Sequence, residues 1–176
     1  MDDKTFVLNL PPMDENNLQK ADQLFFDADE KIKQGLIAEA KTLLEKALEF
    51  NPKHGRSHNH IGWLYEIKYQ DFAQAEEHYK KALEFAPEYP AGYTNYAVVL
   101  SSFERYDELS KHLEKTLTIP GVNKETVYNE YGIMYEKQGK LAEAIEAYTK
   151  ALGYTLNEQA VAGYKSAIAR CKAKLQ

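Results

Sequence analysis

Apolar and small side chains recur along most of the chain with the spacing of helices that bury one face. Tyr128, Tyr131, Gly132 and Tyr135, for example, stand at positions i, i+3, i+4 and i+7. This spacing places them on one side of a helix, whereas a half-buried strand would show strict alternation. Four pairs of such segments follow one another, and a last helical segment ends the sequence. The pattern therefore predicts an all-α protein.

The helical pattern repeats in four copies with a period near 34 residues. In the first helix of each copy, one small residue recurs at intervals of 34, 35 and 35, as Ala28, Gly62, Ala97 and Gly132. In the second helix, another position recurs at intervals of 35, 34 and 35, as Ala47, Ala82, Thr116 and Ala151. A period held through four copies predicts stacked helix pairs. The small residues allow the backbones to approach closely.

Turn and cap residues mark the ends of these helices. Gly35 and Gly139 stand between the two helices of the first and fourth copies, where glycine ends a helix. Pro52 and Pro87 follow second helices, which should stop before a proline. The last segment, 158–175, has one apolar stripe, formed by Val161, Tyr164, Ile168, Cys171 and Leu175. We expect it to close the end of the stack, with Cys171 as a small buried residue.

These features resemble the tetratricopeptide repeat (TPR) family, whose first helix carries aromatic residues around a Leu-Gly pair and whose second helix carries alanines and an aromatic residue. Copy four matches this pattern at Tyr128, Tyr131, Gly132, Tyr135, Gly139, Ala144, Tyr148, Ala151 and Leu152. The resemblance implies a right-handed α-solenoid of four TPR helix pairs, about residues 21–54, 55–89, 90–124 and 125–157. Residues 158–176 would form a capping helix, and residues 1–17 an extended or disordered arm.

The same resemblance implies a role in protein–protein interaction, because TPR proteins bind peptides in a concave groove lined by their first helices. We therefore expect a non-catalytic scaffold or adaptor that anchors a segment of a partner protein on apolar side chains. The expected groove residues are Phe25, Arg56, Asn59, Trp63, Thr94, Asn95, Val98, Asn129 and Ile133. For Trp63 there is an alternative, which is that it only packs against neighbouring first helices and binds no partner.

No known catalytic motif accompanies these repeats. The sequence contains no phosphate-binding loop, dinucleotide-binding glycine motif, nucleophile elbow or zinc-protease helix, so we expect neither a catalytic residue nor a cofactor. The cluster of His54, His58 and His60 suggests an alternative function, that of an accessory subunit or an enzyme with a metal site at 54–60. Such a site would also require a carboxylate or cysteine nearby. We expect no metal, with His58 in a packing position and the other two histidines at the surface.

Net charge, cysteine content and hydropathy limit the partners and the compartment. The formal net charge of −5 argues against nucleic-acid binding, because phosphates require a basic surface. No apolar run reaches the roughly 18 residues of a membrane-spanning helix, and MDDKTFVLNLPP lacks the basic start of a secretory signal. Cys171 is the single cysteine, so no disulfide forms within the chain. These features predict a reduced, cytoplasmic compartment and no membrane insertion.

The two ends of the chain carry opposite charge. Residues 1–30 hold eight acidic residues and two lysines, whereas residues 159–176 hold four basic residues and no acidic ones. Weak self-association by head-to-tail stacking is therefore a further alternative, although exposed charge pairs contribute little. Phe6, Leu8 and Leu10 alternate as in an extended segment, so the arm is either a plain tail or lies on the solenoid.

Overall fold

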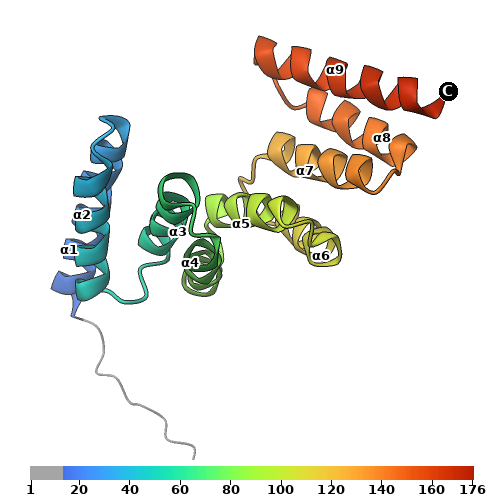
Figure 1. Cartoon of the computed structure of the whole chain (residues 1–176). Helices are drawn as coiled ribbons and strands as arrows, with labels where there is room; N and C mark the ends of the chain where they lie inside the picture. The colour runs from blue at the N-terminus through green and yellow to red at the C-terminus, as the bar shows by residue number, and fades with distance from the viewer. Residues whose placement is uncertain (1–13) are drawn as a thin grey trace, which may run out of the picture.

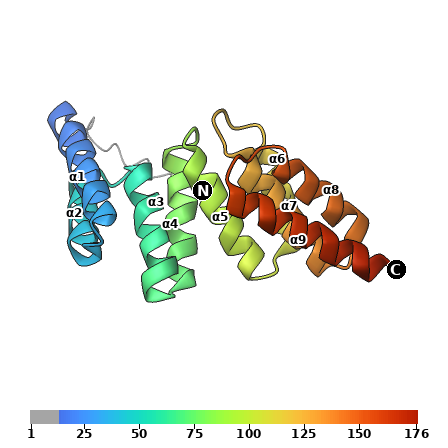
Figure 2. The ribbon, with the colours of Figure 1, turned by 90° about the horizontal axis from the view of Figure 1, so that it is seen from above.

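The computed structural model describes residues 14–176, which form helices and connecting turns without any strand. Successive helices pair and the pairs stack in a curved row, with α1–α2 at one end and α9 at the other (Figures 1 and 2). None of these helices is long and apolar enough to cross a membrane. The predicted all-α solenoid of helix pairs is confirmed. The helices are α1 (Glu15–Lys33), α2 (Ile37–Phe50), α3 (Gly55–Leu64), the π-helical turn η1 (Tyr65–Tyr69), α4 (Phe72–Phe85), α5 (Pro90–Ser102), α6 (Tyr106–Thr116), α7 (Lys124–Lys137), α8 (Leu141–Leu152) and α9 (Glu158–Leu175).

A residue in the left-handed conformation separates the two helices of every pair. Gly35 and Gly139 have φ angles of 76° and 74°, as expected for glycines that end a helix. The equivalent residues of copies two and three are Gln70 and Glu104, with φ angles of 52° and 54°. Glycine adopts this conformation freely, whereas for a residue with a Cβ it costs about 1 kcal/mol or more of conformational free energy. The turn geometry is therefore common to all four copies even where glycine is missing.

Within each pair, a small residue on the first helix faces a large residue on the second. In copies two and four the small residue is glycine and the large one is tyrosine. A Cβ added to Gly62 would lie 3.0 Å from the Tyr79 ring, and one added to Gly132 would lie 2.5 Å from Tyr148 Cδ1. Both tyrosine rings are buried, and their hydroxyls donate to Glu66 (2.6 Å) and Glu136 (3.2 Å), respectively. In copies one and three, alanine and leucine share the core instead, as Ala28 with Leu44 and Ala97 with Leu113.

Helix α9 closes the C-terminal end of the stack. Cys171 is fully buried in one apolar cluster with Tyr148, as predicted for a small buried cysteine. Arg170 donates two hydrogen bonds of 2.7 Å to the carboxylate of Glu136 on α7, and Lys174 adds an ion pair at 3.1 Å. The Arg170 guanidinium is the main cause that lowers the pKa of Glu136 to about 2. The capping role predicted for this helix thus has both an apolar and an ionic basis.

Helix α1 begins at Glu15, inside the segment 1–17 for which an extended or disordered arm was expected. The side chain of Asp14 accepts a hydrogen bond of 3.0 Å from the Asn16 backbone N–H and so caps the helix. Phe6, Leu8 and Leu10 lie outside the described residues, so the placement of the arm stays a prediction.

Candidate binding groove

Trp63 lines an open pocket of about 230 Å³ between the first helices of copies one, two and three. The side chain is half-buried, and it packs against the apolar clusters on both sides of α3. It therefore contributes to packing and also presents surface to the pocket. The other lining residues are Ile32 of α1, Asn59 and His60 of α3, Tyr89 before α5, and Ala91 and Asn95 of α5.

A hydrogen bond between two asparagines fixes the polar part of this pocket. Asn95 Nδ2 donates to Asn59 Oδ1 at 3.1 Å and so links α5 to α3. Asn59 is only 2% exposed, and a buried amide group of this kind requires a partner. Asn59 therefore holds the pocket in shape, whereas the less buried Asn95 can also offer polar atoms to a ligand.

A cluster of aromatic and charged side chains packs between α1 and α3. The ring of Phe25 meets those of His54 and His60 edge-on, at centroid distances of 5.5 and 4.8 Å. The guanidinium carbon of Arg56 lies 4.9 Å from the centroid of Phe25, and the same guanidinium pairs with Asp22 of α1. Phe25 is consequently 6% exposed. It was expected to line the groove and lies instead beneath Arg56 and the two histidines.

The remaining residues expected in the groove do not line the Trp63 pocket. Thr94 and Val98 are half-buried on α5, and the Thr94 hydroxyl donates to the Ala91 carbonyl oxygen at 3.1 Å. On α7, Asn129 donates to Glu130 at 3.3 Å, and Ile133 packs against the cluster that holds α9. The structure thus unites Asn59, Trp63 and Asn95 in one pocket, and its lining excludes Phe25, Arg56, Thr94, Val98, Asn129 and Ile133.

His54 and His60 are not the surface residues that the sequence predicted. His54 is 7% exposed and caps α3, where its Nδ1 accepts a hydrogen bond of 3.3 Å from the Ser57 N–H. The side chain of His60 is 16% exposed, with Nε2 3.5 Å from Asp29 Oδ1. Burial is the main cause that lowers the pKa of both imidazoles, so both are neutral at pH 7. The expectation was wrong because side chains of α1, among them Phe25 and Asp29, contact these two histidines.

His58 fills the packing position expected of it and contacts a fourth histidine. Its Nε2–H donates to the Pro52 carbonyl oxygen at 3.0 Å, so its Nδ1 accepts from the Nδ1–H of His78, also at 3.0 Å. Burial, together with the neighbouring His58, lowers the pKa of His78 to about 4. Among residues 14–176, no three His, Cys, Asp or Glu side chains have the arrangement of a metal site. The histidines in this region make structural contacts.

Comparison with sequence families settles the relationship of the chain to known repeats. A family model described as tetratricopeptide repeat matches residues 28–108, and a second model of the same description matches residues 126–154. The chain belongs to the TPR family. The two matched segments include helices from all four copies of this TPR protein, so the resemblance inferred from the sequence is confirmed. No curated protein sequence matches the chain.

Solved TPR structures share the fold over most of the chain. A structure of pilF from Pseudomonas aeruginosa has a TM-score of 0.79 at 22% identity, and covers 91% of this chain and 71% of that one. YrrB, described as a TPR protein with an unusual peptide-binding site, has a TM-score of 0.70 at 18% identity, with 91% and 80% covered. PilW, described as a type IV pilus biogenesis factor, has a TM-score of 0.69 at 16% identity, with 92% and 78% covered. At such identities the likeness concerns the fold.

Four residues that line the pocket were not among the expected groove residues: Ile32, His60, Tyr89 and Ala91. Of these, Tyr89 lies outside the first helices, just before α5. Pro90 follows it at the first position of the helix and favours an extended backbone at Tyr89, which has φ −88° and ψ 105°. Burial raises the pKa of the Tyr89 phenol. The Tyr-Pro pair at the start of a repeat was the available signal.

Proposed function

We propose that this TPR protein is a non-catalytic scaffold that binds an extended segment of a partner protein at the Trp63 pocket. The observation that carries the proposal is the position of the only tryptophan of the chain, in an open pocket built by the first helices of three successive copies. Tryptophan is among the residues most enriched at the energetic centres of protein interfaces. Proximity to three helices also lets one bound segment contact several copies.

The lining of the pocket indicates what kind of segment it would bind. Ile32 and Trp63 supply apolar surface for a large side chain. The amide of Asn95 and the phenol of Tyr89 lie at the same pocket and can bond to the backbone of the ligand. We therefore expect an apolar side chain flanked by exposed peptide groups, which is the chemistry of an extended segment anchored in a groove. A cytoplasmic location remains a prediction from the sequence.

Selection from a displayed peptide library on the purified protein, followed by affinity measurements, tests this function. Removal of a tryptophan from the centre of an interface costs about 2 kcal/mol or more, which corresponds to a roughly thirtyfold loss of affinity. We expect Trp63→Ala to weaken the selected peptides by this factor per folded molecule, in addition to some loss of stability, and Trp63→Phe to have a smaller effect. If Trp63 is only a packing residue, Trp63→Ala will instead cost about 3–5 kcal/mol of stability. Unchanged affinity per folded molecule would then refute the proposal.

A further inference from the structure

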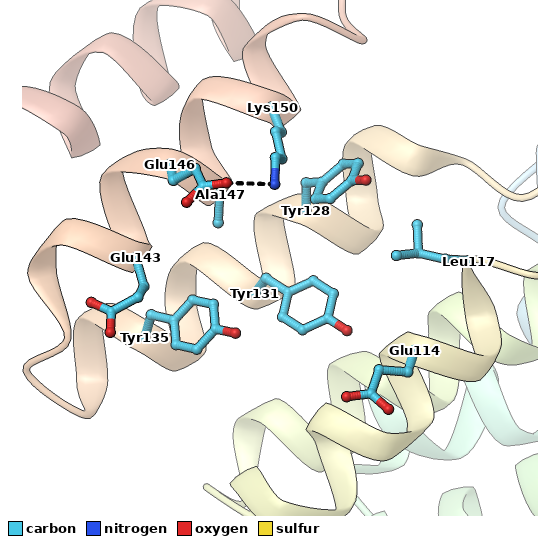
Figure 3. Close-up of a pocket in the computed structure, with 9 residues that line it drawn as sticks. All are labelled: Glu114, Leu117, Tyr128, Tyr131, Tyr135, Glu143, Glu146, Ala147 and Lys150. Carbon is cyan, nitrogen blue, oxygen red and sulfur yellow. Dashed lines mark ion pairs between the residues drawn. The ribbon is translucent and has the colours of Figure 1, made fainter.

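A second cleft, of about 320 Å³, opens between α6, α7 and α8. Three tyrosines of α7, Tyr128, Tyr131 and Tyr135, line it from one side (Figure 3). Glu114 of α6 and Glu143 of α8 stand on either side of these rings, and Ala147 projects toward them from α8. We call this space the tyrosine cleft. It shares no lining residue with the Trp63 pocket, and second helices contribute to its lining, whereas the Trp63 pocket is lined by first helices and Tyr89.

The repeat explains why copy four has this opening. The position of Ala147 recurs at intervals of 35, 34 and 35 residues and is occupied by Leu43, His78, His112 and Ala147. In copy three, the imidazole of His112 stacks on Tyr93 at a centroid distance of 5.8 Å and meets the Tyr96 ring edge-on at 5.1 Å. Its Nε2–H also donates to the Tyr93 carbonyl oxygen at 2.8 Å. Under this cover Tyr93 is 1% and Tyr96 8% exposed.

In copy four, a methyl group replaces this planar ring. Tyr128 and Tyr131 are the counterparts of Tyr93 and Tyr96, each 35 residues later, and both are only half-buried. Ala147 is too short to cover them. Tyr154 stacks on Tyr128 at a centroid distance of 5.7 Å, so the flat, polar side chain of copy three is missing chiefly beside Tyr131.

The charges around the tyrosine cleft favour a cation as its occupant. Its lining has three carboxylates, and the single ammonium, Lys150, pairs with Glu146 at 2.7 Å. Within residues 14–176, Glu114 and Glu143 form no ion pair. A cation placed near either carboxylate would thus meet an uncompensated negative charge.

The tyrosine rings themselves already attract cations at both ends of the row. Lys150 Nζ lies 5.7 Å from the centroid of Tyr128, and Lys140 Nζ lies 5.9 Å from that of Tyr135. In the described part of the chain no cation lies over the central ring, Tyr131. Burial, and secondarily Glu114, raise the pKa of Tyr131 to about 12, so the ring stays neutral with its electron-rich face available.

We propose that the tyrosine cleft binds an arginine side chain on a basic segment of a partner protein. A guanidinium is planar, like the imidazole that fills the equivalent space in copy three, and it stacks on aromatic faces. Its N–H groups can at the same time donate to Glu114 or Glu143. A lysine ammonium offers the charge without the flat surface and would bind more weakly. The site is independent of the Trp63 pocket, so a single partner or two different ones can occupy both.

Nuclear magnetic resonance titration with a defined probe tests the proposal. The probe is the peptide acetyl-Gly-Arg-Gly-amide, and its matched control replaces arginine by citrulline, which has the same shape without the charge. We expect the arginine peptide to shift the backbone amide signals of Tyr128, Tyr131 and Ala147, and the citrulline peptide to bind about tenfold more weakly. Equal binding of both peptides, or shifts confined to other parts of the protein, would overturn the proposal.

Two variants separate the cleft from the rest of the surface. Ala147→His restores the side chain found in copies two and three, and it should weaken the arginine peptide at least about tenfold while the protein stays folded. Glu114→Gln combined with Glu143→Gln should weaken it severalfold, whereas Glu49→Gln with Glu84→Gln removes the same charge from exposed positions of α2 and α4 and should have no effect. Should Ala147→His fail to fold, the two glutamine pairs decide the matter. Equal effects of both pairs, or wild-type affinity in folded Ala147→His, would show that the cleft is not the site.

Discussion

Replacement of Gly132 by alanine tests how closely the two helices of copy four pack. The added methyl carbon would stand 2.5 Å from Cδ1 and 2.9 Å from Cγ of Tyr148, far inside van der Waals contact. The ring cannot move away freely, because Tyr148 is 3% exposed and its hydroxyl donates to Glu136 at 3.2 Å. Overpacking of this kind costs about 1–3 kcal/mol. After the gain of roughly 1 kcal/mol that alanine brings to a helix, we expect a net loss of up to about 2 kcal/mol.

Copies one and three show how the same clash is avoided, because they pair alanine with leucine at these two positions. Leucine lacks the ring carbons that the methyl group would meet. Gly132→Ala should therefore cost much less in a Tyr148→Leu background than in the wild type. The double variant should be more stable than the sum of the single effects by about 1–2 kcal/mol, within the range measured for residues in direct contact.

Urea unfolding of the four proteins, followed by circular dichroism, measures this coupling. Gly163→Ala in α9 is the matched control, because the added methyl group would meet no atom within 4 Å apart from its chain neighbours and the backbone of its own helix. It should stabilise the protein by about 1 kcal/mol. The packing argument is refuted if Gly132→Ala has the same effect in both backgrounds, or if it stabilises as the control does.

Three further predictions follow from the structure. All five histidines have a lowered pKa, that of His78 to about 4, so on acidification the unfolded chain protonates its imidazoles before the folded protein does. The stability contributed by the neutral imidazoles should be fully present above pH 6.5 and fall toward pH 4 in urea titrations, and a flat profile would contradict this. Glu104→Gly relieves the left-handed strain at φ 54° and should raise the free energy of unfolding by about 0.5–1 kcal/mol, whereas Gly35→Ala should lower it. Because Arg170 and Lys174 already pair with Glu136, head-to-tail stacking should be absent, and sedimentation should give one monomer mass at low and high salt; a larger mass at low salt alone would support stacking.

The fold could be predicted because the repeat constrains each copy in the same way. Small residues such as Gly62 and Gly132 stand where the two helices of a pair meet, and glycines such as Gly35 mark the turns. Where glycine is absent, as at Gln70 and Glu104, the neighbouring copies still indicate where the turn lies. Periodicity reports geometry that recurs, so it gave the helix pairs and the capping helix.

The binding site was less predictable, because it depends on contacts between copies that the period does not contain. Phe25 was expected to line the groove, yet Arg56 of the next copy lies over that ring. The tyrosine cleft likewise depends on a difference between copies, Ala147 in place of histidine, and not on what they share. A search for residues that the copies have in common does not detect such a position.

The fluorescence of Trp63 tests the central claim most directly, because it is the only tryptophan in the chain and it lines the proposed pocket. Peptides without tryptophan, selected on the purified protein, would be titrated while the emission spectrum and the heat of binding are recorded on the same samples. The account predicts a saturable blue shift whose midpoint equals the dissociation constant from calorimetry, because the ligand removes the half-buried indole from water. Binding seen by calorimetry with an unchanged Trp63 spectrum would contradict it.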